Sequence, residues 1–286
     1  EPIRQAISEH KPHIAFNLLE EFHSVAQYDQ HVVSYLELMQ QPYTGCNPRG
    51  LLLAHDKALC KKLLTFHRIP TPKFLEFPLD RIVKVPSKVT YPLLVKSVVD
   101  DASLGISQAS IVYNEEKLKE RVRFIHEHIK SDALVEEYIE GREFYVGVLG
   151  NHRLQTLPVW ELKFTKAPED VPLIATRRVK WDLKYQKKLG VKTDAAKDLP
   201  ASVVAQFSRL SKRIYKILNL TGYARMDFRM SKDGKIYALE ANPNPNLSYG
   251  EDLAESADNA GIKYEDLLQR IVNLGLRYRA AWQQDE

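Results

Sequence analysis

The stretch that decides the fold is Arg225-Met226-Asp227-Phe228-Arg229, which is followed after a short break by Leu239-Glu240-Ala241-Asn242-Pro243-Asn244. Polar and apolar residues alternate in both segments, as they do in half-buried strands. The Lys232-Asp233-Gly234 sequence between them is typical of a tight turn. The stretch therefore predicts a β-hairpin.

One face of this hairpin carries most of its charge. Strand alternation places Arg225, Asp227 and Arg229 on the same side of the first strand. It also places Glu240 and Asn242 on one side of the second. In the simplest register about the turn, Asp227 lies nearly opposite Glu240. Two carboxylates and an amide oxygen in one cluster suit a magnesium ion that bridges phosphates. A solvent-facing hairpin with a charged outer side explains the pattern equally well when the hairpin is taken alone.

The rest of the chain alternates strands and helices. We expect strands at 13–19, 91–96, 108–113, 133–138, 143–149 and 154–162, and helices at 27–40, 55–67, 115–128, 201–218 and from about 264. Between them, residues 166–200 form a long polar stretch with seven basic residues from Arg177 to Lys192. A stretch of this kind in a compact domain is usually either functional or mobile.

Three parts follow from this organisation. The prolines of Ile69-Pro70-Thr71-Pro72 break helical hydrogen bonding and predict a boundary. We expect a partial N-terminal α/β domain over 1–68, a small central subdomain over 69–140 and a larger C-terminal subdomain over 141–286. Ligands in α/β and α+β folds usually bind at strand ends and loops, so we expect the site around Lys96 and Glu136.

Composition excludes several classes of protein. The 286 residues are 44% hydrophobic and 27% charged, and 41 basic against 37 acidic residues leave a charge of +4. This balance is too even to indicate nucleic acid or an anionic membrane as the main partner. No run of about 20 apolar residues and no signal-peptide core is seen, so we expect a cytoplasmic protein. Cys46 and Cys60 are too few for a disulfide framework or a zinc site.

From Tyr43-Thr44-Gly45 to the terminal helix, the order and spacing of these motifs resemble the ATP-grasp superfamily and, within it, D-alanine–D-alanine ligase. The resemblance implies an ATP-grasp fold of the α/β (α+β) class with a partial N-terminal Rossmann-like domain. The family begins with a strand and a glycine-containing turn that bind the first substrate, and no such segment precedes Pro12. We therefore expect a trimmed N-terminal domain.

The resemblance also implies which residues bind ATP. Lys57, in His55-Asp56-Lys57, and Lys96 would contact the phosphates, and the loop Asp100-Asp101-Ala102-Ser103-Leu104-Gly105 would close over them, with Ser103 as a donor. The adenine clamp of the family resembles Leu134-Val135-Glu136-Glu137-Tyr138-Ile139.

In this clamp, Glu136 would accept from the exocyclic amine, and the backbone of Glu137 and Ile139 would contact the ring edge. Glu143 would hold the ribose hydroxyls. Taken singly, Glu136 and Glu143 are better explained as surface charge at strand ends, but their spacing from Lys96 and Asp227 favours the nucleotide site.

Reaction chemistry follows from the same resemblance. Lys180-Trp181-Asp182-Leu183-Lys184-Tyr185 is similar to the family's active-site loop, in which Lys184 would contact the γ-phosphate and Tyr185 would approach substrate. Asp227, Glu240 and Asn242 would hold Mg²⁺, with two ions expected and Mn²⁺ as an alternative. Arg225 would stabilise oxyanion charge. The basic stretch alone would equally suit a solvated loop.

The resemblance implies an ATP-dependent carboxylate–amine ligase that forms an acyl phosphate. Its substrates would be ATP, a small carboxylate and an amine, which could belong to an amino acid, a peptide or a specialised metabolite. The family's D-alanine ligases grip the acceptor carboxylate with a serine–leucine pair where this chain has Tyr249-Gly250-Glu251-Asp252. These acids would repel a carboxylate and attract a cationic amine. A non-catalytic nucleotide sensor, a ligase of peptide termini and a homodimer all stay open.

Overall fold

The computed structural model describes residues 2–23, 25–98, 107–168, 173–176, 178–179 and 182–283. Its helices are α1 (Pro2–His10), α2 (Tyr28–Leu38), α3 (Pro48–His55), α4 (Lys57–Phe66), α5 (Glu115–Phe124), α7 (Leu183–Leu189), α8 (Ala201–Ile217), α9 (Asp252–Asn259) and α10 (Tyr264–Arg277). Its strands are β1 (Phe74–Phe77), β2 (Leu93–Ser97), β3 (Ile111–Val112), β4 (Ala133–Glu137), β5 (Gly141–Leu149), β6 (Gln155–Thr156), β7 (Trp160–Phe164), β8 (Val191–Ala195), β9 (Tyr223–Ser231) and β10 (Ile236–Pro243).

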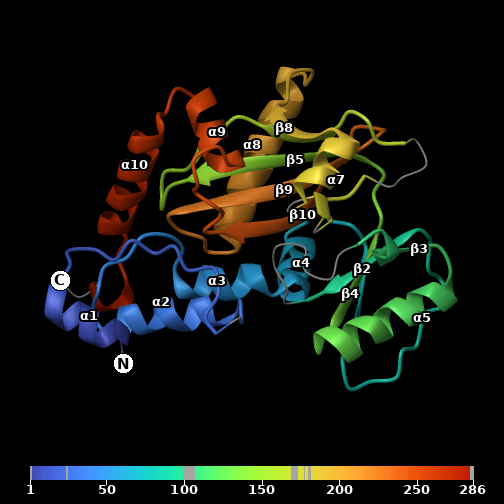
Figure 1. Ribbon diagram of the computed structural model, residues 1–286, viewed down its shortest axis with the longest axis horizontal. Coiled ribbons are helices and arrows are strands. Elements are labelled where there is room, and N and C mark those ends of the chain that lie inside the picture. The colour runs from blue at the N-terminus through green and yellow to red at the C-terminus, as the bar shows by residue number, and fades with distance from the viewer. Residues whose placement is uncertain are drawn as a thin grey trace.

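These strands form two separate antiparallel sheets. The smaller sheet has four strands in the order β1-β4-β2-β3, and the larger runs β10-β9-β5-β7-β8, with β6 paired to β5. In Figure 1 the smaller sheet lies at the lower right beside α5, and the larger sheet lies above the N-terminal helices. Each sheet has a hydrophobic core of its own, so the region between the sheets is open to polar groups.

The larger sheet is covered on one face by α8. Phe207 of this helix packs between Phe144 of β5 and Phe228 of β9, with ring-centroid distances of 5.1 and 5.4 Å. Such aromatic contacts add to the stabilisation that burial alone supplies. Because side chains alternate along a strand, neighbours of Phe144 and Phe228 such as Tyr145 and Asp227 point to the other face.

The hairpin of β9 and β10 confirms the expected pairing of Asp227 with Glu240. The pairing is reached through a change of register along the hairpin, which the sequence did not predict. Near the turn, Ile236 pairs with Met230 and Ala238 with Phe228, which is one residue out of that register. A bulge between Ala238 and Glu240 then restores it. A bulge inserts one extra residue, so it aligns the two carboxylates after an unexpectedly long turn.

The chain enters the larger sheet at Gly141, where β5 runs close against β9. A Cβ atom on this glycine would lie 2.0 Å from the carbonyl oxygen of Met230, and its φ is +157°. Only glycine fits such an approach. Nearby, the N–H of Glu137 donates to the carbonyl of Lys73 over 2.8 Å, so the chain leaving the smaller sheet runs beside the chain entering it.

The strand expected over 13–19 is wrong. Only an isolated bridge joins Ala15 to Tyr43, supported by bonds from Ala15 N to the Pro42 carbonyl and from Thr44 N to the Ala15 carbonyl. Among the described residues no further segment pairs with residues 13–19. The alternating pattern of this segment therefore does not produce a strand, because a strand needs a neighbour to pair with along its length.

Several other elements differ from expectation. The 154–162 strand divides into β6 and β7 around Pro158, which has no N–H to donate. The 108–113 strand begins as a 3-10 turn at Gln108–Ser110, and the 115–128 helix ends as a π-turn at Ile125–Ile129. The described part of the 166–200 stretch contains α7, which Asp182 caps by accepting from Tyr185 N, and then β8. The sequence did not indicate α3, β1 or α9.

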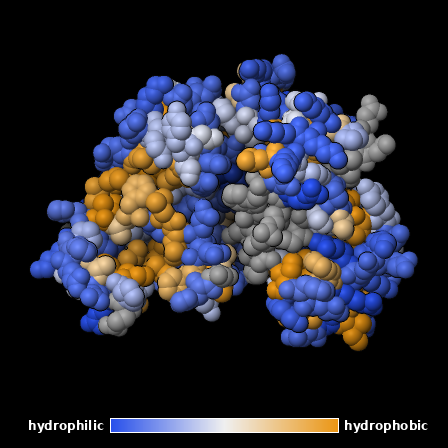
Figure 2. Space-filling model, in the orientation of Figure 1, coloured by the Kyte–Doolittle hydropathy of each residue, from blue (hydrophilic) through white to orange (hydrophobic). Residues whose placement is uncertain are grey.

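The N-terminal helices pack into the core of the larger sheet. Buried Val33, Tyr43 and Leu51 share one cluster with Phe207 and Phe228. Figure 2 shows apolar surface on the left of the molecule, where the N-terminal segment and α10 lie. Exposed apolar side chains of that segment include Leu18, at 68% exposure, and Leu38, at 82%. No helix of the described chain is long and apolar enough to cross a bilayer.

Candidate active site

A cavity lies between the two sheets, and both contribute to its walls. Its apolar lining includes Leu94 of β2, Ile174 and Leu239 of β10. Seven of the site residues predicted from the sequence line this cavity, and six of them are polar, namely Lys96, Glu136, Glu137, Glu143, Asp227 and Glu240, while the seventh is Ile139. Apolar walls with a few convergent polar groups are typical of small-molecule sites.

A buried charge cluster forms one end of this cavity. The Oε1 atom of Glu136 lies 3.0 Å from the Nζ atoms of both Lys96 and Lys61. Burial by itself raises the pKa of Glu136, but the two ammonium groups outweigh burial and leave its pKa below the ordinary value. Glu136 is therefore a carboxylate at neutral pH.

The second fixed cluster joins β5 to β9. Arg229 Nη2 donates to Glu143 Oε2 over 2.6 Å, and the Tyr145 hydroxyl donates to Glu143 Oε1 over 2.9 Å. Burial raises the pKa of Tyr145 well above its ordinary value, and the carboxylates of Glu143 and Asp227 add to this shift. The phenol thus stays protonated and keeps donating. Each oxygen of Glu143 retains a lone pair for a further donor.

Arg225 is held in a cage of fixed groups. Its Nε and Nη2 atoms donate to Oδ1 and Oδ2 of Asp227, both over 2.8 Å, and its guanidinium stacks 4.6 Å from the Tyr145 ring centroid. Its Nη1 lies 3.7 Å from Oδ2 of Asp252. Burial opposes the charge on Arg225, but the carboxylate of Asp227 outweighs burial and raises the pKa. The guanidinium is preorganised and permanently charged.

A second cavity adjoins the first on the side of Arg225 and Asn242. Its lining contains four carboxylates, those of Glu20, Asp29, Glu251 and Asp252. The basic side chains in the same lining are Arg225, Lys192 and His55. Asp29 Oδ1 lies 3.4 Å from His55 Nδ1. Burial raises the pKa of Glu251, and the charge of Asp252 adds to the shift, with Arg225 opposing it. The wall beyond Arg225 is therefore acidic.

The donor set at the hairpin fits a magnesium ion if a ligand supplies further oxygens. Asp227 and Glu240 are register partners, and Asn242 follows on the same strand face. Within the described chain, no group of three His, Cys, Asp or Glu residues could hold a metal by itself. Magnesium in proteins is usually bound through one or two carboxylates plus phosphate oxygens, which is what this arrangement offers.

The remaining predicted residues are placed less centrally. Lys57 is buried, and its Nζ lies 3.9 Å from Glu240 Oε2. Lys184 and Tyr185 lie on α7, where the Arg178 guanidinium stacks 4.2 Å from the Tyr185 ring; neither residue lines either cavity, so their roles stay predictions. Ser103 and the rest of 99–106 lie outside the described residues, as do Lys180 and Trp181.

Sequence reasoning missed Lys61, Tyr145 and His55 as site residues. Lys61 follows Lys57 by four positions on α4, so the two lysines share a helix face. Tyr145 follows Glu143 by two positions on β5 and shares its strand face. These periodicities are visible in the sequence once the elements are known.

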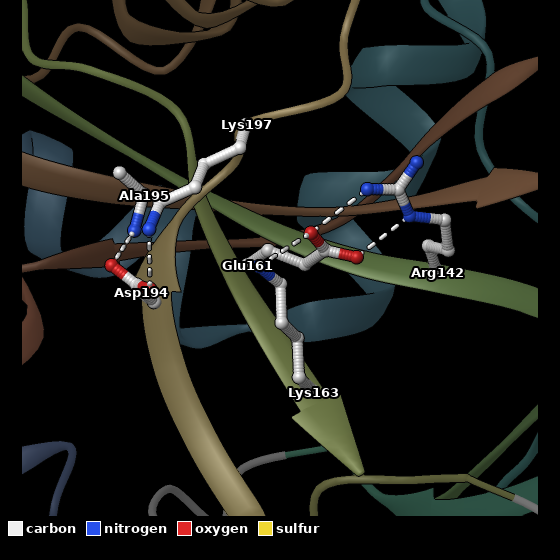
Figure 3. A network of polar contacts seen from close by, with 6 residues as sticks. All are labelled: Arg142, Glu161, Lys163, Asp194, Ala195 and Lys197. Carbon is white, nitrogen blue, oxygen red and sulfur yellow. Dashed lines mark hydrogen bonds and ion pairs between the residues drawn. The ribbon is translucent and has the colours of Figure 1, made fainter. Parts of the chain in front are cut away.

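A further ion network lies on the opposite face of the larger sheet (Figure 3). Arg142 Nε and Nη2 donate to Glu161 over 2.6 and 2.8 Å, and Lys163 Nζ lies 3.5 Å from the same carboxylate. Asp194 beside it accepts from Ala195 N, with Lys197 Nζ at 3.6 Å. Glu161 pairs in register with Phe144, whose side chain faces α8, so this network does not belong to the cavity.

Two antiparallel sheets with separate cores, a cavity between them and an acidic hairpin at its mouth define an ATP-grasp protein. The family model described as the D-Ala D-Ala ligase C-terminus matches residues 63–273. The chain belongs to this family.

Individual relatives agree with that assignment. The chain is 31% identical to a D-alanine–D-alanine ligase of Desulfotalea psychrophila, over 92% of this chain and 78% of that protein. It is also 31% identical to the uncharacterised protein y4sG of Sinorhizobium fredii, over 92% and 75%. A solved structure of D-alanine–D-alanine ligase from Bacillus anthracis, complexed with ATP, matches with a TM-score of 0.78 at 26% identity and covers 97% of this chain and 84% of that one.

Proposed function

We propose that the protein is an ATP- and magnesium-dependent ligase that joins a carboxylate to an amine. The observation that carries the proposal is the gathering of Lys96, Glu136, Glu143, Asp227 and Glu240 around one cavity, beside the fixed guanidinium of Arg225. The ATP complex of the Bacillus anthracis relative supports ATP as the nucleotide.

The chemistry suits the charges of the site. A substrate carboxylate oxygen attacks the γ-phosphorus of ATP, and the bond to ADP breaks. The amine then attacks the acyl carbon, loses a proton, and phosphate leaves from the tetrahedral intermediate. Arg225 would supply the donor for negative charge on that intermediate, while Lys57 and Lys96 would neutralise the polyphosphate.

Magnesium would be held by Asp227, Glu240 and Asn242 together with nucleotide oxygens, as one ion or two, and Mn²⁺ offers the same coordination chemistry. The ion would neutralise phosphate charge during transfer. Asp227 can serve Arg225 and a metal together, since each carboxylate oxygen has two lone pairs. Lys184 and Tyr185 remain candidates for the γ-phosphate and the substrate.

The acceptor is proposed to be a cationic amine, free of a carboxylate near its nucleophilic nitrogen. Glu251 and Asp252 stand at the N-terminus of α9, where carboxylates of the chain itself occupy the favourable end of the helix dipole. Glu20 adds a third acid to the same cavity. A substrate carboxylate would be repelled there, whereas a second ammonium group would be attracted.

We also propose that the protein forms a homodimer through the apolar surface of its N-terminal segment. Analytical ultracentrifugation would measure its mass in solution and test this proposal.

The first experiment is magnesium-dependent phosphate release from ATP, measured across amino acids, dipeptides and di- or polyamines with small carboxylates. Ligation predicts substrate-dependent release and a product whose mass is one water below the summed substrates. Release only with long acceptors would favour a ligase of peptide termini. Tight ATP binding with no release under any pairing would contradict the proposal and favour a nucleotide sensor.

The acceptor assignment has its own variant. Glu251→Gln removes one charge from the second cavity and should raise the KM for a diamine about tenfold, as loss of one charge-assisted contact does, while the KM for ATP is unchanged. Glu255→Gln, one turn further along α9, is the matched control. A wild-type preference for D-alanine over diamines would overturn the cationic acceptor and leave ligation standing.

A further inference from the structure

Lys61 is a buried lysine that lies behind the wall of the cavity between the two sheets and contacts Glu136, which lines that cavity. Its side chain is 1% exposed, like that of Glu136, and its Nζ donates to Thr71 Oγ1 over 2.9 Å. The Thr71 hydroxyl in turn donates to the carbonyl of Ala238, on β10. Lys61 thereby connects α4, β4 and the strand that carries Glu240.

The charges around Glu136 do not balance one to one. A single carboxylate faces two ammonium groups, Lys61 and Lys96, each 3.0 Å from the same oxygen. Lys96 lines the cavity, whereas Lys61 does not. If Lys96 were the sole partner of Glu136, the two opposite charges would cancel, and the pair would present no net charge to a ligand.

We infer that Lys61 is a positioning residue that neutralises Glu136 and leaves the positive charge of Lys96 available to the phosphates of the nucleotide. The inference rests on the proposed use of ATP. Lys61 touches neither phosphate nor base in this role; it sets the electrostatic state of the groups that do. A purely structural lysine would instead tie α4 to its neighbours and leave phosphate binding indifferent to its charge.

Comparing ATP with adenosine separates these two roles, because only ATP carries the phosphates. Calorimetric titration of the full chain, at fixed magnesium concentration, would measure both ligands. Lys61→Met should raise the Kd for ATP about tenfold or more, the effect of losing one charge-assisted contact, and change that for adenosine less than about twofold. Lys61→Arg should retain ATP affinity. Lys62→Met is the matched control, because the Lys62 side chain is 56% exposed and pairs with Glu76. This variant should bind both ligands normally.

A double variant guards against misfolding, since Lys61→Met alone leaves a buried carboxylate with one partner. Lys61→Met combined with Glu136→Gln removes that carboxylate and should recover the ratio of ATP affinity to adenosine affinity that Lys61→Met lowers, with urea unfolding as the folding control. Unchanged ATP binding in Lys61→Met, or no recovery of that affinity ratio in the folded double variant, would overturn the role of Lys61. Wild-type protein that binds neither ligand would overturn the proposed function as well.

Discussion

At the residue scale, the guanidinium of Arg225 is held in place by three neighbouring side chains. Asp227 binds it with both oxygens, Tyr145 lies under it, and Asp252 approaches from α9. A guanidinium so fixed loses little entropy when charge develops beside it, which is the condition for strong transition-state stabilisation.

Arg225→Ala should therefore lower kcat for ligation about 10²-fold or more, the usual loss for an oxyanion donor. Glu240→Ala should also abolish ligation, because it removes a metal ligand. Arg142→Ala, an arginine on the opposite face of the same sheet, is the control and should keep normal turnover. Urea unfolding would establish that each variant is folded; near-normal turnover of folded Arg225→Ala would remove this residue from the mechanism.

Much of the site was predictable residue by residue. Alternation along β9 and β10 brought Asp227, Glu240 and Asn242 together, because one buried face fixes the register of a hairpin. The bulge that completes the register was not predictable, since Leu239 has no distinctive side chain. The partners of Glu136 were also hidden, because Lys61 comes from another part of the chain and meets it only after folding.

At the element scale, the join between α3 and the larger sheet depends on one asparagine. Asn47 caps α3 by accepting from Gly50 N over 2.8 Å, and its Nδ2 donates to the carbonyl of Asn219 over 2.7 Å. Asn114 caps α5 in the same way through Lys117 N, but its side chain is exposed. The two caps differ mainly in burial and in the number of bonds they make.

Asn47→Ala should lower the free energy of unfolding by about 2 kcal/mol, the cost of a cap plus the loss of the part-buried hydrogen bond to Asn219. Asn114→Ala should cost about 1 kcal/mol. Urea denaturation of both variants measures the difference. Equal losses would show that burial of the Asn47 cap adds nothing.

Long periodic elements were the ones the sequence located well. The helices expected at 27–40 and 201–218 appear as α2 and α8, within two residues at each end. Short elements such as β1 and α9 were missed, because four or eight residues carry too little periodicity to stand out. The prediction of a strand over 13–19 was wrong, because alternation shows only that a segment could form a strand. It does not show whether another strand is available to pair with it.

At the scale of the whole molecule, the sequence predicted the ATP-grasp fold through the order of its motifs, and the structure has that fold. The division at 68 and 140 remains a prediction. What no pattern indicated is that residues of the N-terminal segment complete the core of the C-terminal sheet, as Tyr43 and Leu51 do with Phe207. Such contacts join positions more than a hundred residues apart, and local periodicity carries no record of them.

The chain segments at Lys73 and Glu137 run antiparallel and side by side, which has a topological consequence. Because the polypeptide leaves the larger body and returns at one place, everything between is topologically an insertion, with its own apolar interior. Exchange of that insert for a homologous one would need two short junctions and a matching partner for Lys61, which pairs with Glu136 of the insert. The cavity takes Lys96 and Glu136 from the insert and Glu143, Asp227 and Glu240 from the other side of those junctions, so its two walls belong to separately exchangeable parts of the chain.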